Sequence, residues 1–294
     1  MAHHIYSVGG LEFSVCLPAD TDADALLPSF RPFRRTAATA VPLFVLAVCE
    51  TPQQLRPAAG TLLDELDNDM GHTRVSVIPD GYRIDLRYAA AGCVHTMVTS
   101  PDFTRALVAL DWSDPAAGLV LGSLLRIVYS QAALLRGAVS IHAAAVHRDG
   151  RAYLFMGRSG TGKSTHARQW LATLPGATLL NDDNPVVRVV DGQAWAYGSP
   201  WSGKTPCYRD EQYPVGGMVR LVQSPVNRYE PLTGTAAFVA LYPGCSVITT
   251  EPPLHDALCA TLSRLADSVP LGQLFCRPEP AAALLCWNAF NETR

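Results

Sequence analysis

The residues with the clearest chemical capacity form one glycine-rich run, GRSGTGKST, at residues 157–165. The run matches the pattern GxxxxGK[ST] in full. In this pattern the glycines let backbone N–H groups turn inward around a phosphate. The lysine reaches the outer phosphates, and the hydroxyl of the serine or threonine that follows it binds Mg²⁺. A helix that begins here adds the positive end of its dipole. The run therefore predicts a site for a nucleoside triphosphate such as ATP.

The sequence around the run supports this prediction. The apolar residues 153–156 predict a strand before it, and a helix should run from Lys163 to about Leu174. A glycine-rich turn without a ligand is the weaker alternative. We expect Lys163 on the phosphates and Ser164 on Mg²⁺. The predicted nucleotide-binding residues are Gly157, Ser159, Gly160, Thr161, Gly162, Lys163, Ser164 and Thr165.

Two adjacent aspartates, Asp182 and Asp183, follow the next predicted strand at residues 177–180. Asp182 comes nineteen positions after Lys163, which leaves room for one helix and one strand. Many P-loop NTPases place the Mg²⁺-binding aspartate farther along, so this spacing favours a different lineage. Neighbouring strand residues point to opposite faces, which suits one aspartate to the metal and the other to an incoming hydroxyl. The alternative is a strand-to-turn cap.

A third candidate, His142, lies in the predicted strand 139–147. If Asp149-Gly150 is a two-residue hairpin turn, His142 lies opposite Gly157, the first residue of the glycine-rich loop. It would then contact the γ-phosphate or support an aspartate. A structural role is the alternative, and a one-residue bulge would shift the register.

The run 198–206 is rich in turn-forming residues, and long loops beside a site often contact the substrate. An ordinary structural loop explains the run equally well. The candidate substrate contacts are Trp201, Ser202, Lys204 and Arg209.

The order of expected strands and helices along the chain predicts an α/β protein with a mixed sheet and a smaller α+β N-terminal domain. We expect an N-terminal domain over residues 1–112 and a phosphate-loop domain over 113–294, with the long helix 115–135 bridging them or belonging to the second. The segment 74–88 predicts a hairpin around Asp80-Gly81, and residues 102–110 predict a helix. Residues 186–190 and 193–197 predict a second hairpin.

Composition excludes several classes of function. The net charge of −3 leaves no basic surplus for nucleic acid. The apolar stretch 116–135 contains Arg126 and four other polar residues, so it favours a buried helix over a membrane span. Eight scattered cysteines without a CxxC pair, and no secretory signal, favour reduced thiols in a cytoplasmic protein without zinc. We therefore expect neither nucleic acid nor a membrane among its partners.

With these residues assembled, the second half resembles the HPr kinase/phosphorylase group, whose nucleotide-binding core is shared with ATP-dependent phosphoenolpyruvate carboxykinases. The resemblance covers about residues 138–245. The chain is similar above all to stand-alone HPr-kinase-like bacterial proteins. The motifs of this chain that carry the resemblance are Ile141-His142, GRSGTGKST, Asp182-Asp183, LLNDDNPVVR at 179–188 and GSPWSGKTPCYR at 198–209.

The resemblance implies that Lys163 and Ser164 contact phosphate and Mg²⁺, that Asp182 is the base, that Asp183 binds the metal and that His142 assists. It also implies homo-oligomers. The chain departs from the family in two ways. PWSGKT at 200–205 stands where HPr kinases have a Glu-Arg-Gly signature, and the N-terminal domain does not look like theirs. HPr as substrate and the reverse phosphorylase activity therefore do not follow.

We expect an ATP- and Mg²⁺-dependent kinase that phosphorylates a hydroxyl, either a serine, free or in a protein or peptide, or a small-molecule alcohol. One alternative is a nucleotide-responsive regulatory protein without phosphoryl transfer. Another is a carboxykinase-like enzyme, or one that uses pyrophosphate or ADP, because no adenine-specific motif is recognisable.

Overall fold

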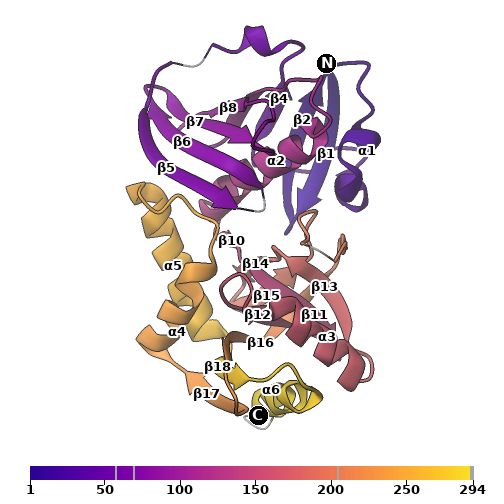
Figure 1. Cartoon of the computed structure of the whole chain (residues 1–294), viewed down its shortest axis with the longest axis vertical. Helices are drawn as coiled ribbons and strands as arrows, with labels where there is room; N and C mark the ends of the chain where they lie inside the picture. Colours follow the sequence, from indigo (N-terminus) through magenta and orange to yellow (C-terminus); the bar gives the residue numbers. More distant parts are fainter. Residues whose placement is uncertain (57, 69, 204, 292–294) are drawn as a thin grey trace. The chain divides into compact units, whose positions relative to one another are not determined.

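The structure, a computed structural model, describes residues 1–56, 58–68, 70–203 and 205–291. It is an α/β protein with two mixed sheets, each of nine strands in the described part of the chain (Figure 1). Contacts between residues divide the chain into two compact units. The first holds residues 1–136 and 248–254, and the second holds residues 137–247 and 255–294.

The first unit is one sheet with a long helix against it. Its strands lie in the order β3-β1-β2-β4-β9-β8-β7-β6-β5, antiparallel except where β4 pairs with β2 and β9. Its elements are β1 Ala2–Val8, β2 Leu11–Leu17, α1 Ala23–Leu26, η1 Pro28–Phe33, β3 Arg34–Arg35, β4 Val45–Val48, η2 Pro52–Gln54, β5 Thr61–Asn68, β6 Gly71–Ile78, β7 Gly81–Arg87, β8 His95–Thr99, β9 Arg105–Ala109 and α2 Ala117–Leu134.

The helix α2 belongs to this first unit, so the division lies at residues 136/137 and not at the expected 112/113. Tyr129 of α2 packs its ring 5.8 Å from that of Phe13, and its hydroxyl donates to the Val8 carbonyl at 3.0 Å. Among the described helices, α2 is the one with the length and hydropathy of a membrane span, yet 67% of that stretch is buried inside the protein. This burial agrees with the predicted buried helix.

Two local predictions in the first unit need correction. The hairpin at 74–88 forms, but Ile78 pairs with Gly81, so the turn is Pro79-Asp80 and not Asp80-Gly81. The predicted helix over 102–110 is wrong, because residues 105–109 form β9. The Asp102 carboxylate accepts from the Ser100 hydroxyl at 2.6 Å and the Thr104 N–H at 3.1 Å, and this tight turn replaces a helix start.

The second unit holds the glycine-rich run. Its main strand order is β10-β14-β15-β16-β12-β11-β13, with β18 beside β16 and β17 beside β18. Its elements are β10 Ala138–Ser140, β11 Ala143–Arg148, β12 Arg151–Met156, α3 Lys163–Thr173, β13 Thr178–Asp183, β14 Val186–Val190, β15 Gln193–Tyr197, β16 Gln212–Gln223, β17 Arg228–Leu232, α4 Gly234–Leu241, η3 Tyr242–Gly244, most of α5 Pro252–Ser268, β18 Leu271–Cys276 and α6 Pro280–Asn291.

The predicted strand at 139–147 is in fact two strands. It breaks at Ile141-His142, so that β10 pairs with β14 while β11 pairs with β12 and β13. The β11–β12 hairpin has the predicted register, with Arg148 opposite Arg151. Asp149 and Gly150 have φ values of 50° and 72°, as a type I′ turn requires. The second predicted hairpin, β14–β15, is also confirmed.

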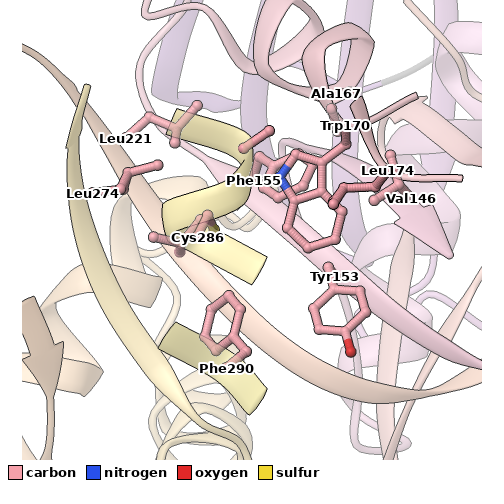
Figure 2. Close-up of a cluster of buried hydrophobic side chains, with 13 residues drawn as sticks. Val146, Tyr153, Phe155, Ala167, Trp170, Leu174, Leu221, Leu274, Cys286 and Phe290 are labelled. Carbon is pink, nitrogen blue, oxygen red and sulfur yellow. The ribbon is translucent and has the colours of Figure 1, made fainter. Parts of the chain in front are cut away.

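A buried apolar cluster holds the helices α3 and α6 against one face of this sheet (Figure 2). Trp170 of α3 is fully buried, with its ring 5.1 Å from Phe155 of β12. From α6, Phe290 and Cys286 complete the cluster. Because α3 begins at Lys163, this packing also sets where the glycine-rich loop ends.

We predict that Gly217→Ala destabilises the second unit by about 1–3 kcal/mol, since overpacking a well-filled core has a cost of that size. A Cβ at Gly217 would overlap with the ring of Phe290. Chemical denaturation monitored by tryptophan fluorescence measures the change.

The matched control is Gly122→Ala in α2, where an added Cβ meets nothing within 4 Å. This change should stabilise the helix by about 0.5–1 kcal/mol. Equal effects of the two substitutions would contradict the proposed packing of Gly217.

Candidate functional site

The ends of three neighbouring strands bring the predicted site residues to one edge of the second sheet. In the register of β11, Ala143 pairs with Met156 of β12 on one side and with Asp183 of β13 on the other. Met156 leads directly into the glycine-rich loop, and His142 directly precedes Ala143. His142 itself lies outside the ladder, and its backbone N–H donates to the Gly244 carbonyl at 2.7 Å.

The loop after β12 has the backbone that its glycines predict. Gly157, Gly160 and Gly162 have φ values of 154°, 77° and 108°, which side chains with a Cβ rarely adopt. The Thr161 hydroxyl donates to the Arg158 carbonyl at 2.7 Å and closes the turn. Gly162 then caps the N-terminus of α3. The strand–loop–helix context that the motif requires is therefore present.

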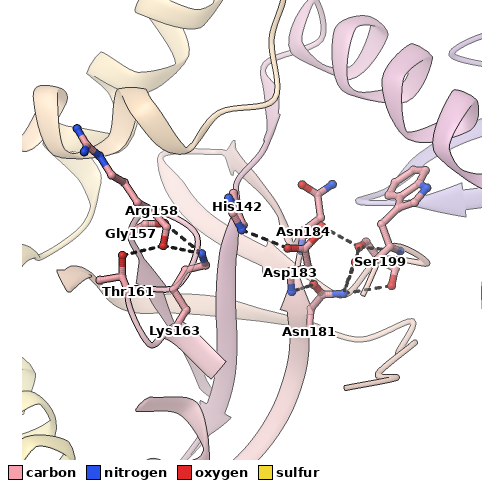
Figure 3. Close-up of polar contacts among 10 residues, drawn as sticks. His142, Gly157, Arg158, Thr161, Lys163, Asn181, Asp183, Asn184 and Ser199 are labelled. Atoms are coloured by element: carbon pink, nitrogen blue, oxygen red, sulfur yellow. Dashed lines mark hydrogen bonds and ion pairs between the residues drawn. The ribbon is translucent and has the colours of Figure 1, made fainter. Parts of the chain in front are cut away.

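Lys163 is buried and lies back across the start of this loop (Figure 3). Its Nζ donates to the carbonyls of Gly157 at 3.1 Å and Arg158 at 3.3 Å. The ammonium group is thus held within the turn of the loop. This position suits a cation that interacts with phosphate groups held by the loop.

Gln223, at the end of β16, holds the loop from a neighbouring strand. Its Nε2 donates to the carbonyl of Gly160 at 3.3 Å and lies 3.5 Å from that of Thr161. Sequence reasoning missed this residue. No local signal could have found it, because the contact joins residues more than sixty positions apart.

The two aspartates face opposite sides of the sheet, as their adjacent positions predict. Asp182 pairs with Ala144, whose side chain belongs to the apolar cluster beneath α3, whereas Asp183 pairs with Ala143. Asp182 is only 3% exposed. Its Oδ2 is buried and has no hydrogen-bond partner among the described residues. Such an atom costs about 1–3 kcal/mol of stability, which a functional role would explain.

Asp183 and His142 form the contact between neighbouring strand ends. The Nε2 of His142 lies 3.3 Å from Oδ1 of Asp183, and both side chains are partly exposed. Figure 3 shows the imidazole between the glycine-rich loop and the aspartate. The hypothesis that His142 supports an aspartate agrees with this geometry.

A network of buried hydrogen bonds, made by the side chains of Asn181 and Ser199 and called the polar bracket here, fixes the backbone around the aspartates. Asn181 is fully buried, and its Oδ1 accepts from the backbone N–H groups of Asp183 at 3.1 Å and Asn184 at 2.8 Å. Its Nδ2 donates at 3.2 Å to the carbonyls of Ser199 and Trp201. Sequence reasoning missed both Asn181 and Ser199, although asparagines on each side of the aspartate pair are visible in the sequence.

Of the candidate substrate residues, Trp201 and Ser202 lie beside the aspartates and Arg209 does not. Trp201 is buried within this bracket, and Ser202 forms a β-bridge with Asp183. Arg209 instead lies 3.6 Å from Glu211, whose other oxygen lies 3.7 Å from His147, in the half of β11 away from His142. The remaining candidate, Lys204, lies outside the described residues.

The structure shows no three His, Cys, Asp or Glu side chains gathered as a metal site within its described residues. A cation held by Asp183 and Ser164 would therefore need further oxygen ligands. Phosphates and water supply those ligands for Mg²⁺ in many nucleotide sites.

His166, one turn into α3, packs between this helix and the strand β12. Burial lowers the pKa of His166 to about 4. Its Nε2 accepts from the Trp170 indole N–H at 3.1 Å, and its ring lies edge-on to Phe155. The imidazole is therefore neutral and structural, as expected for a packing residue.

Comparisons with known proteins add little to this geometry. No protein-family model and no curated protein sequence matches the chain. Among solved structures, an Hpr(Ser) kinase/phosphatase from Coxiella burnetii is similar with a TM-score of 0.32 and 12% identity, over 52% of this chain and 95% of that chain. A likeness this weak carries no argument about function.

We predict that Asn181→Ala destabilises the second unit by about 2–5 kcal/mol, because truncation leaves several buried backbone groups without partners. The free energy of unfolding from denaturant titration measures this. Asn227→Ala is the control, since Asn227 also bonds backbone and side chain but lies partly exposed beside Glu279. A loss no greater than that of the control would contradict the bracket's role.

We also predict that His166 makes stability depend on pH. The pKa of His166 is about 6.5 in the unfolded chain and about 4 in the folded protein. The contribution of His166 to the free energy of unfolding is therefore fully present above pH 6.5 and is lost as the pH falls toward 4. Between pH 7 and pH 5 the loss should be about 2 kcal/mol. Denaturant titrations at both pH values, with His166→Gln for comparison, measure it. An equal pH dependence in this variant would contradict the assignment.

Proposed function

We propose that this protein is a phosphotransferase that moves the γ-phosphoryl group of ATP to a hydroxyl. The observation that carries the proposal is the buried Oδ2 of Asp182, which has no hydrogen-bond partner among the described residues and lies at the same sheet edge as the glycine-rich loop. A buried carboxylate oxygen aimed at no described partner is suited to receive a proton from a substrate.

The triphosphate would lie on the loop between β12 and α3. The backbone N–H groups around Gly160 and Gly162 and the N-terminus of α3 attract anions. Lys163 would exchange its contacts with the loop carbonyls for the outer phosphates. The nucleotide-binding residues would be those of the run 157–165.

Mg²⁺ would be held by Ser164 and Asp183. Both residues supply the hard oxygen ligands that this cation prefers, and Asp183 is partly exposed at the loop's sheet edge. When bound, the cation neutralises charge on the phosphate oxygens. His142, 3.3 Å from Asp183, would keep that carboxylate in one orientation.

Asp182 would act as the base. As the acceptor oxygen bonds to the γ-phosphorus, its proton passes to Asp182 Oδ2 and the bond to the β-phosphate oxygen breaks, so that ADP leaves. Burial excludes water from this carboxylate, which favours transfer to the substrate over hydrolysis. Catalysis would otherwise rest on positioning and charge neutralisation.

The acceptor would be a serine or a small-molecule alcohol, bound near Trp201 and Ser202. The bridge from Ser202 to Asp183 and the bond from Gly203 N–H to the Asp182 carbonyl, 2.6 Å, join this segment to the aspartates. Substrate contacts there would reach the carboxylates directly. We expect the reaction to occur in the cytoplasm, without nucleic acid or membrane as a partner.

We predict that Asp182→Asn keeps Mg-ATP binding but lowers kcat by about 10²–10⁴-fold, the usual contribution of general base catalysis. Lys163→Ala should instead weaken Mg-ATP binding by about tenfold or more. Calorimetry with a non-hydrolysable ATP analogue measures binding. Transfer of labelled phosphate from ATP to a panel of alcohols and serine peptides measures turnover.

Asp191→Asn is the matched control, because Asp191 lies in the β14–β15 turn with a φ of 51° that asparagine tolerates. It should change neither quantity. Nucleotide binding that survives Lys163→Ala would contradict the phosphate site. Binding without transfer to any acceptor, or turnover unaffected by Asp182→Asn, would favour a nucleotide-responsive regulatory protein.

A further inference from the structure

The first unit contains a second charged site that has no part in the proposed reaction. It is a cavity of about 260 Å³ lined by side chains of the strands β6 and β7. Its lining residues are His72, Arg74, Arg83, Asp85, Arg87 and Val94. Four of the six are basic, in a chain whose net charge is −3.

The register of the strands explains why these side chains gather. His72 pairs with Arg87, and Arg74 pairs with Asp85, so all four point to the same face of the sheet. The alternate residues, such as Ile84 and Leu86, are fully buried on the opposite face. The cavity therefore lies on the face of the strands that the core leaves open.

Three of the four basic side chains already have carboxylate partners. Arg83 Nε lies 2.8 Å from Asp85, and Arg74 Nε lies 3.5 Å from Glu65. His72 is held between Glu65 at 2.9 Å and Asp67 at 3.0 Å. These contacts compensate the positive charge on that part of the cavity.

Arg87 differs from the other three. It has neither an ion pair nor a side-chain hydrogen bond with any described residue, and its Nε is buried. A guanidinium has five N–H donors and is always charged, so leaving the buried Nε–H of Arg87 without a partner is costly. A bound anion would satisfy it, and a carboxylate matches its planar fork with two parallel hydrogen bonds.

We propose that this cavity binds the carboxylate group of a small molecule through Arg87. A single uncompensated guanidinium calls for a single negative charge. Asp85 in the lining disfavours a doubly charged phosphate. Val94, which is 58% exposed, offers an apolar surface for the rest of the molecule. The site is independent of the proposed phosphoryl transfer, because it lies in the other unit.

The test follows the Arg87 Nε–Hε resonance and the backbone amides of β6 and β7 by NMR on the full chain. Butyrate is the probe, neutral butyramide is its isostere, and ionic strength is kept constant with chloride. We expect butyrate to shift these resonances saturably and butyramide to leave them unchanged. In Arg87→Gln, the butyrate dissociation constant from the backbone amides should rise about tenfold or more.

Arg105→Gln is the matched control, because Arg105 lies on β9 of the same sheet but does not line the cavity. Butyrate should bind this variant as it binds the wild type. No saturable shift, tighter binding of inorganic phosphate than of butyrate, or equal affinity in Arg87→Gln would each overturn the proposal. None of these outcomes bears on nucleotide binding at the glycine-rich loop, so the two proposals fail separately.

Discussion

The candidate site depends on one strand, β11, that is paired on both sides. Ala143 at its start lies opposite Met156 and opposite Asp183, which brings three segments that are distant in the sequence to one sheet edge. A one-residue change of register between β11 and β13 would turn the aspartates to the wrong faces. A bulge between Ala145 and Val146 is absorbed within the β11–β13 pairing, and the pairs at the site end are regular.

The same edge concentrates polar groups that a core would normally exclude. Asn181, Asp182, Asn184 and Ser199 are all buried, and Asn181 contacts the backbone of both Asp183 and Trp201. Such a bracket is stable only if its members are satisfied. The buried Oδ2 of Asp182 has no hydrogen-bond partner among the described residues, and the apolar cluster of Trp170, Phe155 and Phe290 nearby offsets its cost. Proteins commonly accept this kind of local destabilisation where a group must act on a substrate.

The two units handle charge differently. In the second unit, Asp182 and Asp183 lie at the end of β13, at the same sheet edge as the end of β12, where the glycine-rich loop begins. In the first, arginines and acids alternate across the open face of a sheet, and ion pairs between described residues compensate each of the cavity's basic groups except Arg87. Both arrangements arise because ladder partners share a face, so residues distant in sequence form one chemical surface.

Much of the second unit could be predicted from the sequence, because its signals are local. Glycines at 157, 160 and 162, the Asp149-Gly150 turn and the spacing to Asp182 each depend on a few neighbouring residues. The helix expected at 102–110 failed because an Asx turn at Asp102 starts a strand that the sheet then pairs. Tertiary structure alone decided the unit to which α2 belongs, the contacts of Asn181 and Gln223, and the isolation of Arg87. These depend on contacts between distant segments, and no local pattern encodes them. The loop at 157–165 was thus determined by the sequence, whereas the groups that hold it and face it were decided by the fold.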